Sequence, residues 1–253
     1  RRWRLAPEAM RILGVDTGGD RRGKRAEPGT LGHLLERNAA LRDVFADDPA
    51  RQARLAELQR WQSARLLKSH DDLHRHARYR LPVEFFCNEL YAAGDPRARD
   101  RDLIKVQRVM EKLLPAEALR AMCLAIELEI LSQELDAAVV RGLPAGPLTV
   151  ETYAEGYRSA GRRPDRERQI LLMLEIGQYL DHVVKKPIVR ALVRLARGPA
   201  HAAGFGLLQE FLERGLGAFE AMRGADEFLA TIREREWRWM ERLFAATPNP
   251  FEY

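Results

Sequence analysis

Three glutamates and one histidine have the residue types and spacing of a metal site inside a helix bundle. Glu127 and Glu134 are seven residues apart, and so are Glu175 and His182. Each pair therefore lies on one face of its predicted helix. Inward-facing carboxylates and imidazoles bind iron or manganese in bundle enzymes, usually with a Glu-x-x-His motif that this sequence lacks. A metal-dependent bundle enzyme is the alternative interpretation, and ordinary exposed carboxylates are the expected one.

A histidine-rich stretch, HDDLHRHARY over residues 70–79, has some features of a zinc site. His70 and His74 are four residues apart, and Asp71 stands where His-Glu-x-x-His proteases carry their catalytic glutamate. Aspartate is one methylene shorter than glutamate, and Arg80 occupies the position of a third ligand. We therefore expect a solvated helix face over these residues.

Residues 12–19 read Ile-Leu-Gly-Val-Asp-Thr-Gly-Gly, which resembles the first phosphate loop of sugar kinases and other actin-like ATPases. That loop functions only between strands of a mixed sheet, and the rest of the sequence predicts no strand. We interpret the stretch as part of a flexible basic lead-in.

A basic amphipathic helix is predicted over residues 187–197. Arginines at i, i+4 and i+7 form one face, two lysines precede them, and Val, Leu and Ala form the opposite face. Such a helix binds an acidic partner or an anionic lipid surface, unless it is an ordinary surface helix with its apolar side in the core. The five basic residues of this candidate binding site are Lys185, Lys186, Arg190, Arg194 and Arg197.

Two dense mixed-charge stretches, residues 97–102 and 162–168, open predicted helices. Buried arginine–carboxylate networks that fix helix register are the structural interpretation. An anion site built from the arginines is the functional alternative.

Two aromatic segments are expected to have structural roles. Phe85 and Phe86 are expected in the core, and the tail over residues 247–253 is expected to pack on its own body rather than on a partner.

Helices must position all of these residues. Apolar residues recur at helical spacing from about residue 30 onward, and prolines and glycines punctuate the pattern. The predicted fold is all-α, a single bundle-like domain of about ten helices without a sheet. We expect a flexible basic lead-in over residues 1–29 and a helical domain over residues 30–253. The predicted helices span 31–46, 49–79, 83–93, 98–114, 116–141, 149–160, 165–185, 187–197, 204–222 and 225–245.

Composition restricts the classes of function. The chain has 253 residues, of which 46% are hydrophobic, and a net charge of +5. Residues 1–26 carry eight basic and three acidic side chains, which leaves 34 of each sign on the remaining chain. A nucleic-acid partner is therefore not expected, because the folded part has no basic excess. No apolar run is long enough to span a membrane. We expect a cytoplasmic protein in which Cys87 and Cys123 are buried, reduced thiols.

The sequence resembles a family of uncharacterised proteobacterial proteins. The resemblance is carried by Phe-Phe-x-x-x-Leu-Tyr at residues 85–91, by Arg-Asp-x-Asp at residues 99–102 and by further segments up to residue 251. It departs from the family pattern at residues 92–94, where Gly-Pro is more typical. The resemblance implies an α-helical domain and carries no activity, ligand or functional residue.

These observations favour a non-enzymatic helical binding or scaffold protein that holds a protein partner through a helical groove or through residues 185–206. No cofactor is predicted, and a homodimer is one expected form of partnership. The alternative remains the metal-dependent enzyme using Glu127, Glu134, Glu175 and His182.

Overall fold

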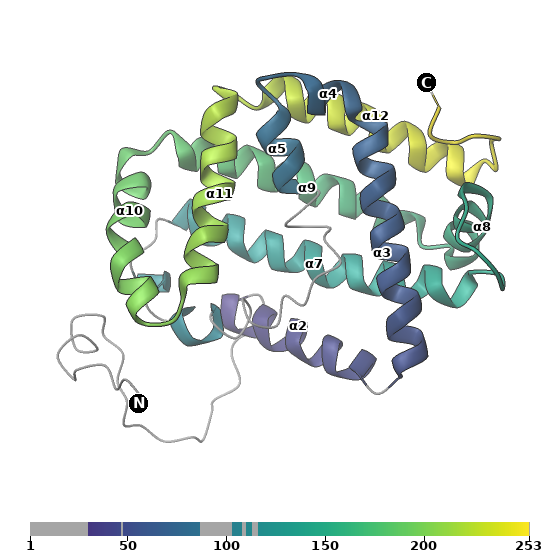
Figure 1. The fold of residues 1–253 in the computed structure, drawn as a ribbon, viewed down its shortest axis with the longest axis horizontal. Coiled ribbons are helices and arrows are strands. Elements are labelled where there is room, and N and C mark those ends of the chain that lie inside the picture. Colours follow the sequence, from purple (N-terminus) through teal and green to yellow (C-terminus); the bar gives the residue numbers. More distant parts are fainter. Residues whose placement is uncertain (1–29, 47, 87–102, 108–109, 113–115, 253) are drawn as a thin grey trace.

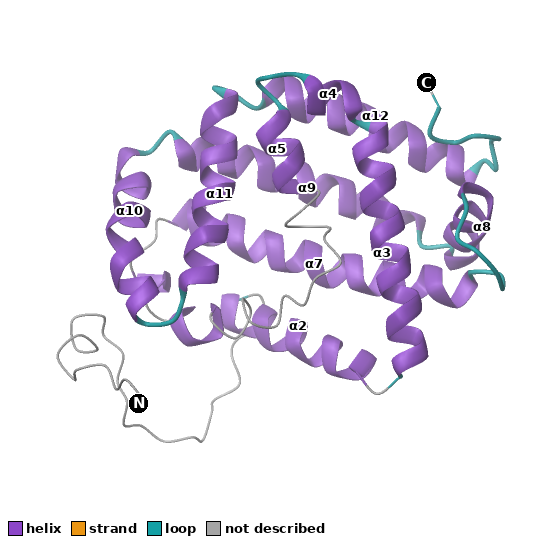
Figure 2. Cartoon of the chain, in the orientation of Figure 1, coloured by secondary structure: helices purple, strands orange, loops and turns teal. Residues whose placement is uncertain are grey.

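The computed structural model describes residues 30–46, 48–86, 103–107, 110–112 and 116–252. Helices are the regular elements of this part of the chain, which contains no strand (Figure 2). The predicted all-α fold is confirmed. The helices are α2 (Leu31–Ala46), α3 (Pro49–Ser69), α4 (Asp71–Arg75), α5 (Arg80–Phe85), α7 (Ala116–Gly142), α8 (Val150–Ala160), α9 (Arg163–Val184), α10 (Pro187–Ala202), α11 (Gly206–Met222) and α12 (Asp226–Phe244).

Several predictions fall outside the described residues. They include the lead-in over residues 1–29, Cys87, the mixed-charge stretch over residues 97–102 and Tyr253. The division into a lead-in and one helical domain therefore stays a prediction. Cys123 is only half-buried, and burial raises the pKa of its thiol. Among the described helices, none combines the length and the apolar composition needed to cross a bilayer.

Two long helices, α7 and α9, lie side by side in the middle of the molecule (Figure 1). In the same view α2 and α12 run beside them on opposite sides, and α3 and α11 cross the set at a steep angle. Helix α8 lies at one end of this arrangement and α10 at the other. Helix α7 contacts α2, α3, α8 and α9, so it is the element around which most of the others pack.

Local capping explains why several helices begin and end where the sequence predicts. The Asp48 side chain accepts a hydrogen bond from the Arg51 amide at 3.0 Å and caps α3. Thr149 and Thr152 form a reciprocal capping box at the start of α8. Gly161 ends α8 with a φ of 62°, a left-handed conformation that glycine adopts without a steric penalty.

The largest differences between the predicted and the described helix boundaries are at the ends of α3 and α10. The helix predicted over residues 49–79 ends at Ser69, because the backbone breaks at His70 and turns the imidazole inward. The helix predicted to end at residue 197 continues through Pro199 to Ala202. Pro199 lacks the amide proton that would bind the Leu195 carbonyl, but both residues are solvent-exposed, so water can satisfy that carbonyl.

Aromatic side chains fill the core between α5, α11 and α12, as predicted for Phe85 and Phe86. The Phe85 ring lies 5.4 Å from Phe211, and Phe86 lies 6.1 Å from Phe219 and 6.2 Å from Phe228. These separations are typical of favourable aromatic pairs. Both residues therefore have a structural role.

Two glycines of α11 provide a matched test of this packing. A Cβ atom at Gly215 would lie 2.8 Å from Cζ of Phe85, whereas a Cβ atom at Gly217 meets nothing within 4 Å. Gly215→Ala should lower the free energy of unfolding by about 1–3 kcal/mol through overpacking. Gly217→Ala should raise it by about 0.5–1 kcal/mol, because alanine favours the helix. Urea unfolding of both variants measures the difference, and equal effects would contradict this account of the α5–α11 contact.

Candidate functional site

A polar cavity lies inside the helical body, between α3, α7, α8, α9 and α12. Its volume is about 70 Å³, which is room for several water molecules or one small ligand. Polar groups from four of these helices face aromatic rings from α8, α12 and the C-terminal tail. Charged and aromatic side chains that converge on one enclosed space are typical of small-molecule sites. This cavity is the candidate functional site.

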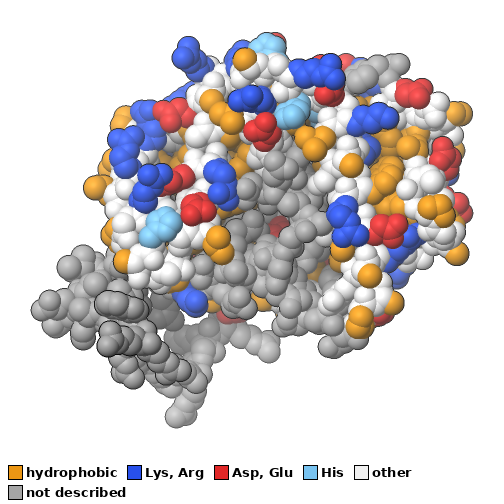
Figure 3. All heavy atoms as spheres, viewed as in Figure 1, with side chains coloured by type: hydrophobic (Ala, Val, Ile, Leu, Met, Phe, Trp, Pro, Cys, Tyr) orange, Lys and Arg blue, Asp and Glu red, His pale blue; other side chains and the backbone are white. Residues whose placement is uncertain are grey.

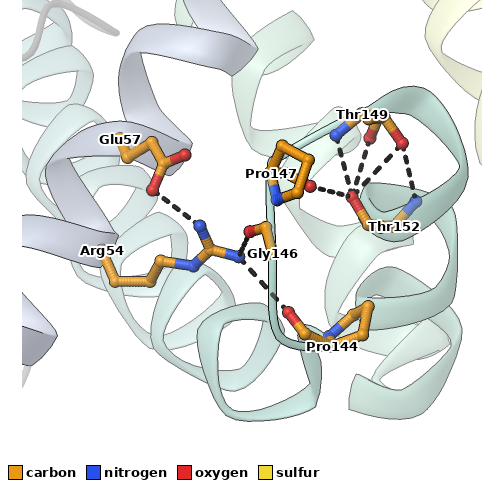
Figure 4. A network of polar contacts seen from close by, with 7 residues as sticks. All are labelled: Arg54, Glu57, Pro144, Gly146, Pro147, Thr149 and Thr152. Atoms are coloured by element: carbon orange, nitrogen blue, oxygen red, sulfur yellow. Dashed lines mark hydrogen bonds and ion pairs between the residues drawn. The ribbon is translucent and has the colours of Figure 1, made fainter.

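The position of α8 depends on a polar network between α3 and the loop before α8 (Figure 4). Arg54 of α3 bonds Glu57 at 2.7 Å and donates to the carbonyl oxygens of Gly146 at 3.0 Å and Pro144 at 3.4 Å. The capping box then starts α8 immediately after this loop. The network therefore fixes the start of α8, the helix whose Tyr153 and Tyr157 line the cavity.

One side of the cavity is an ion pair between α3 and α12. Arg65 donates to Glu236 Oε1 at 3.4 Å, and both side chains are largely buried, with 14% and 17% of their areas exposed. The guanidinium carbon of Arg65 lies 5.4 Å from the centre of the Trp239 ring and 4.8 Å from that of Phe251. Burial alone raises the pKa of Glu236, but the positive charge of Arg65 and a hydrogen bond from His70 outweigh it and lower the pKa. Glu236 is therefore held as a carboxylate.

His70 is buried beside this pair, which corrects the prediction of a solvated face at residue 70. Its Nε2 lies 3.2 Å from Glu236 Oε1, and its Nδ1 lies 3.4 Å from Nη1 of Arg235. A guanidinium can only donate, so Nδ1 accepts and the Nε2 proton points at Glu236. His70 therefore contributes a hydrogen bond that holds the Glu236 carboxylate in place. His74 does not join it, because its Nε2 contacts Glu84 at 3.2 Å.

Arg166 of α9 is another charged residue of the lining. Only 6% of the residue is exposed. Its Nη1 donates to Gln169 Oε1 at 3.0 Å, and its guanidinium carbon lies 4.5 Å from the centre of the Tyr157 ring. Its buried Nη2 has no hydrogen-bond partner within the described chain. No described carboxylate forms an ion pair with Arg166, so its charge is not neutralised by direct contact.

Asp136 of α7 also lines the cavity and is 7% exposed. It accepts a hydrogen bond from Gln62 Nε2 at 3.0 Å. Burial raises the pKa of Asp136, although the charge of Arg166 and hydrogen bonds from Gln62 and Gln59 act in the opposite direction. The cavity therefore favours the protonated acid more than water does. A perturbed carboxyl in an enclosed polar space is a marker of functional sites.

The C-terminal tail covers the cavity. The Phe251 ring lies 6.2 Å from Trp61, 6.2 Å from Tyr153 and 6.1 Å from Trp239. Arg242 of α12 donates to the carbonyl oxygens of Asn249, at 3.0 Å, and of Glu252, which holds the tail in place. The tail packs on its own body, as predicted. Trp239 and Phe251 thus form the aromatic wall on this side.

The predicted metal residues do not come together, which corrects the grouping of Glu127, Glu134, Glu175 and His182. Within the described chain, no three carboxylate, thiol or imidazole side chains cluster as metal ligands. Each glutamate instead faces an arginine of another helix: Glu127 pairs with Arg168, Glu134 with Arg37 and Arg162, and Glu175 with Arg120. Nδ1 of the exposed His182 lies 2.8 Å from the carbonyl oxygen of Gln178 in its own helix.

The predicted basic site before and on α10 is present, but most of its charges are paired. Arg190 and Arg197 contact glutamates of α11, Lys185 contacts Asp181, and Lys186 contacts Glu117. Only Arg194 makes no ion pair with the described residues. The apolar side of α10 is divided between the core and solvent: Val189 is buried, whereas Ile188 and Leu195 are exposed.

Sequence reasoning found part of the cavity. Arg166 belongs to the 162–168 stretch, for which an anion site was one of the two interpretations. Asp136 and Glu236 were missed. Asp136 is the one polar residue in the buried segment Leu-Asp-Ala-Ala-Val over residues 135–139. A single carboxylate inside such a run is the signal that would have identified it.

Comparison with known proteins gives a family without a function. Residues 41–250 match the family model described as a domain of unknown function, DUF8198. Neither the curated proteins nor the solved structures contain a match to the chain. The matched range includes every residue of the cavity except Phe251.

The Arg65–Glu236 pair generates a stability prediction. Glu236→Gln should lower the free energy of unfolding by about 3 kcal/mol at neutral pH, because it leaves a buried arginine without its counter-charge. The folded-state pKa of Glu236 is lowered, so its stabilising effect is fully present above the ordinary value of 4.5 and is lost as pH falls through the folded value. The difference from wild type should therefore shrink as pH falls below 4.5.

Urea unfolding at a series of pH values measures this effect. Glu234→Gln on the same helix is the control, because Glu234 is exposed and pairs only with Arg238 one turn away. Its effect should stay below about 0.5 kcal/mol. A Glu236→Gln effect as small as the control's would show that the buried pair contributes little.

Proposed function

We propose that this chain, which belongs to the DUF8198 family, is a non-enzymatic binding protein that holds a small polar molecule in its interior cavity. The observation that carries the proposal is the cavity itself, where α3, α7, α9 and α12 contribute polar groups to one shared space. A void that served only packing would be lined by apolar side chains and would stay dry.

Binding is favoured over catalysis because the carboxylates of the cavity are already engaged. Glu236 receives hydrogen bonds from Arg65 and His70, and Asp136 receives one from Gln62. These bonds hold both carboxyl groups in fixed positions, where their remaining lone pairs can receive hydrogen bonds from a ligand. The half-buried thiol of Cys123 does not line the cavity. These groups support an arrangement that orients a ligand.

Native mass spectrometry of gently purified protein tests this function. Wild type should carry a small mass excess that is lost on denaturation, or should acquire one when incubated with small polar molecules. Ile170 lines the cavity and is 7% exposed, so Ile170→Phe fills the space without removing a hydrogen bond. That variant should lose the ligand.

Ile170→Val is the matched control, because it enlarges the cavity slightly and should keep the ligand. Circular dichroism and cooperative thermal unfolding establish that both variants fold. Retention of the same ligand by Ile170→Phe would place the site elsewhere. A bare mass together with no binding in a thermal-shift screen of small polar molecules would overturn the proposed function.

The exposed apolar residues at the α10 end favour a second candidate function, self-association. The exposed fractions are 57% for Ile188, 74% for Leu195 and 60% for Leu207, and Ile188 and Leu195 lie seven residues apart on one face of α10. Isolated exposed leucines are ordinary, but neighbouring ones mark interaction surfaces.

The charges around these residues suit a second copy of this chain. Figure 3 shows basic, acidic and apolar side chains interleaved over α10 and α11. The pairs Arg190–Glu220 and Arg197–Glu213 give the face both signs of charge. A two-fold dimer places the same patch on both sides of its interface, so a patch with both signs can complement itself. The partner expected for Lys185, Lys186, Arg190, Arg194 and Arg197 is therefore the same helix of another copy.

Light scattering during gel filtration measures this association. Wild type should form dimers, and Leu195→Asp should convert them to monomers by placing a charge in the apolar contact. Leu171→Asp, at a leucine of α9 that is 44% exposed, is the control and should stay dimeric. A monomeric wild type at high protein concentration would exclude the second candidate and leave the cavity proposal unaffected.

A further inference from the structure

We propose that the molecule held in the cavity is a small monocarboxylate, bound through the guanidinium group of Arg166. This inference rests on the proposed function and names the chemical class of its ligand. It is carried by a buried cation that has no anion in contact with it. Arg166 lines the cavity, and its buried Nη2 has no hydrogen-bond partner in the described chain.

A buried, unpaired guanidinium is unfavourable, because the protein interior does not replace the hydration of the charge. Its remaining contacts are one side-chain amide, from Gln169, and the face of the Tyr157 ring. Gln169 is itself fixed by donating to Ser132 at 2.8 Å. The guanidinium is therefore held in one orientation with an unsatisfied donor, which is an arrangement prepared for an acceptor.

The charges around the cavity favour one negative charge in the ligand. Arg65 and Glu236 form a pair, so their charges offset each other. Burial raises the pKa of Tyr157, so that phenol keeps its proton. The remaining charged groups are Arg166 and Asp136. These two form no ion pair within the described chain, so the guanidinium of Arg166 is the cation of the lining with which an incoming monoanion can pair.

Shape and size favour a carboxylate among the anions. The planar fork of a guanidinium matches a carboxylate, and a singly charged ligand matches one unpaired arginine. Part of the lining is apolar or aromatic, from Ile170, Leu243, Tyr153 and Trp239. A short apolar tail can lie against these side chains. A dianionic phosphate would bring a charge that no second free cation of the lining balances.

Isothermal titration calorimetry on the full chain tests the proposal. The probes are acetate, propionate and butyrate, with propionamide as the uncharged analogue and inorganic phosphate as the competing anion, at constant ionic strength. At least one carboxylate should bind wild type, and propionamide should bind at least about tenfold more weakly, because it lacks the charge that pairs with Arg166.

Two substitutions on α9 provide the matched comparison. Arg166→Gln should weaken carboxylate binding by at least about tenfold. Arg168→Gln removes an arginine two residues away that is exposed and paired with Glu127, so the affinity should stay within about threefold of wild type. Should Arg166→Gln fail to fold, the comparison of propionate with propionamide on wild type decides alone.

The outcomes separate this inference from the proposed function. Equal binding of propionate and propionamide, stronger binding of phosphate, or unchanged affinity in folded Arg166→Gln would each overturn the monocarboxylate assignment. A neutral or cationic molecule that binds wild type but not Ile170→Phe would overturn it while the cavity remains a binding site. If no small molecule binds and the native mass is bare, both the inference and the proposed function fail.

Discussion

Two guanidinium groups, those of Arg65 and Arg166, line the interior cavity of this helical protein, and the need to compensate their charge organises the residues around them. Arg65 has an ion-pair partner: Glu236 supplies the counter-charge, and the Trp239 and Phe251 rings cover the guanidinium. Arg166 is compensated in part, by one amide and one aromatic face. Both residues enter the same cavity from different helices. Arg65 has a carboxylate partner and so stabilises the fold, whereas Arg166 has none in the described chain and so remains able to bind a ligand.

Elements far from the arginines contribute by closing the space around them. The Arg54 network ties the loop before α8 to α3 and so places Tyr153 and Tyr157 against the cavity. Beside these tyrosines, left-handed conformations at Ala246 and Asn249 turn the chain after α12, and Arg242 holds the resulting tail. Without the loop before α8 and the C-terminal tail, water would hydrate both guanidinium groups, and neither would need a carboxylate partner. The low exposure of Arg166 is therefore a property of the loops as much as of α9.

The helices were predictable because the signals that define them are local. The 3.6-residue period, the Thr149 capping box and Gly161 gave the limits of α8 to within one residue. The cavity was not predictable in the same way, because it joins residues that are far apart in the chain, such as Arg65, Asp136 and Glu236. Periodicity shows that a residue lies on a buried face but not which helix it meets there. His70 illustrates the limit: its charged neighbours in sequence suggested solvent, whereas the end of α3 directs its ring to Glu236.

The same reasoning separates the basic helix from the buried arginine. Charge density along the sequence selected α10, yet most of its basic side chains lie beside carboxylates at the surface, where such pairs contribute little and leave no strong demand for an external anion. Arg166 lies in a stretch of balanced charge, but it is buried and has no ion pair within the described chain. An anion would therefore stabilise Arg166 more than it would stabilise the paired basic residues of α10. Helix α9 separates the two regions by about 30 Å at 1.5 Å per residue. A ligand at Arg166 and a second copy at α10 would therefore not exclude each other by contact, and any influence of one on the other would have to pass along α9 and its neighbours.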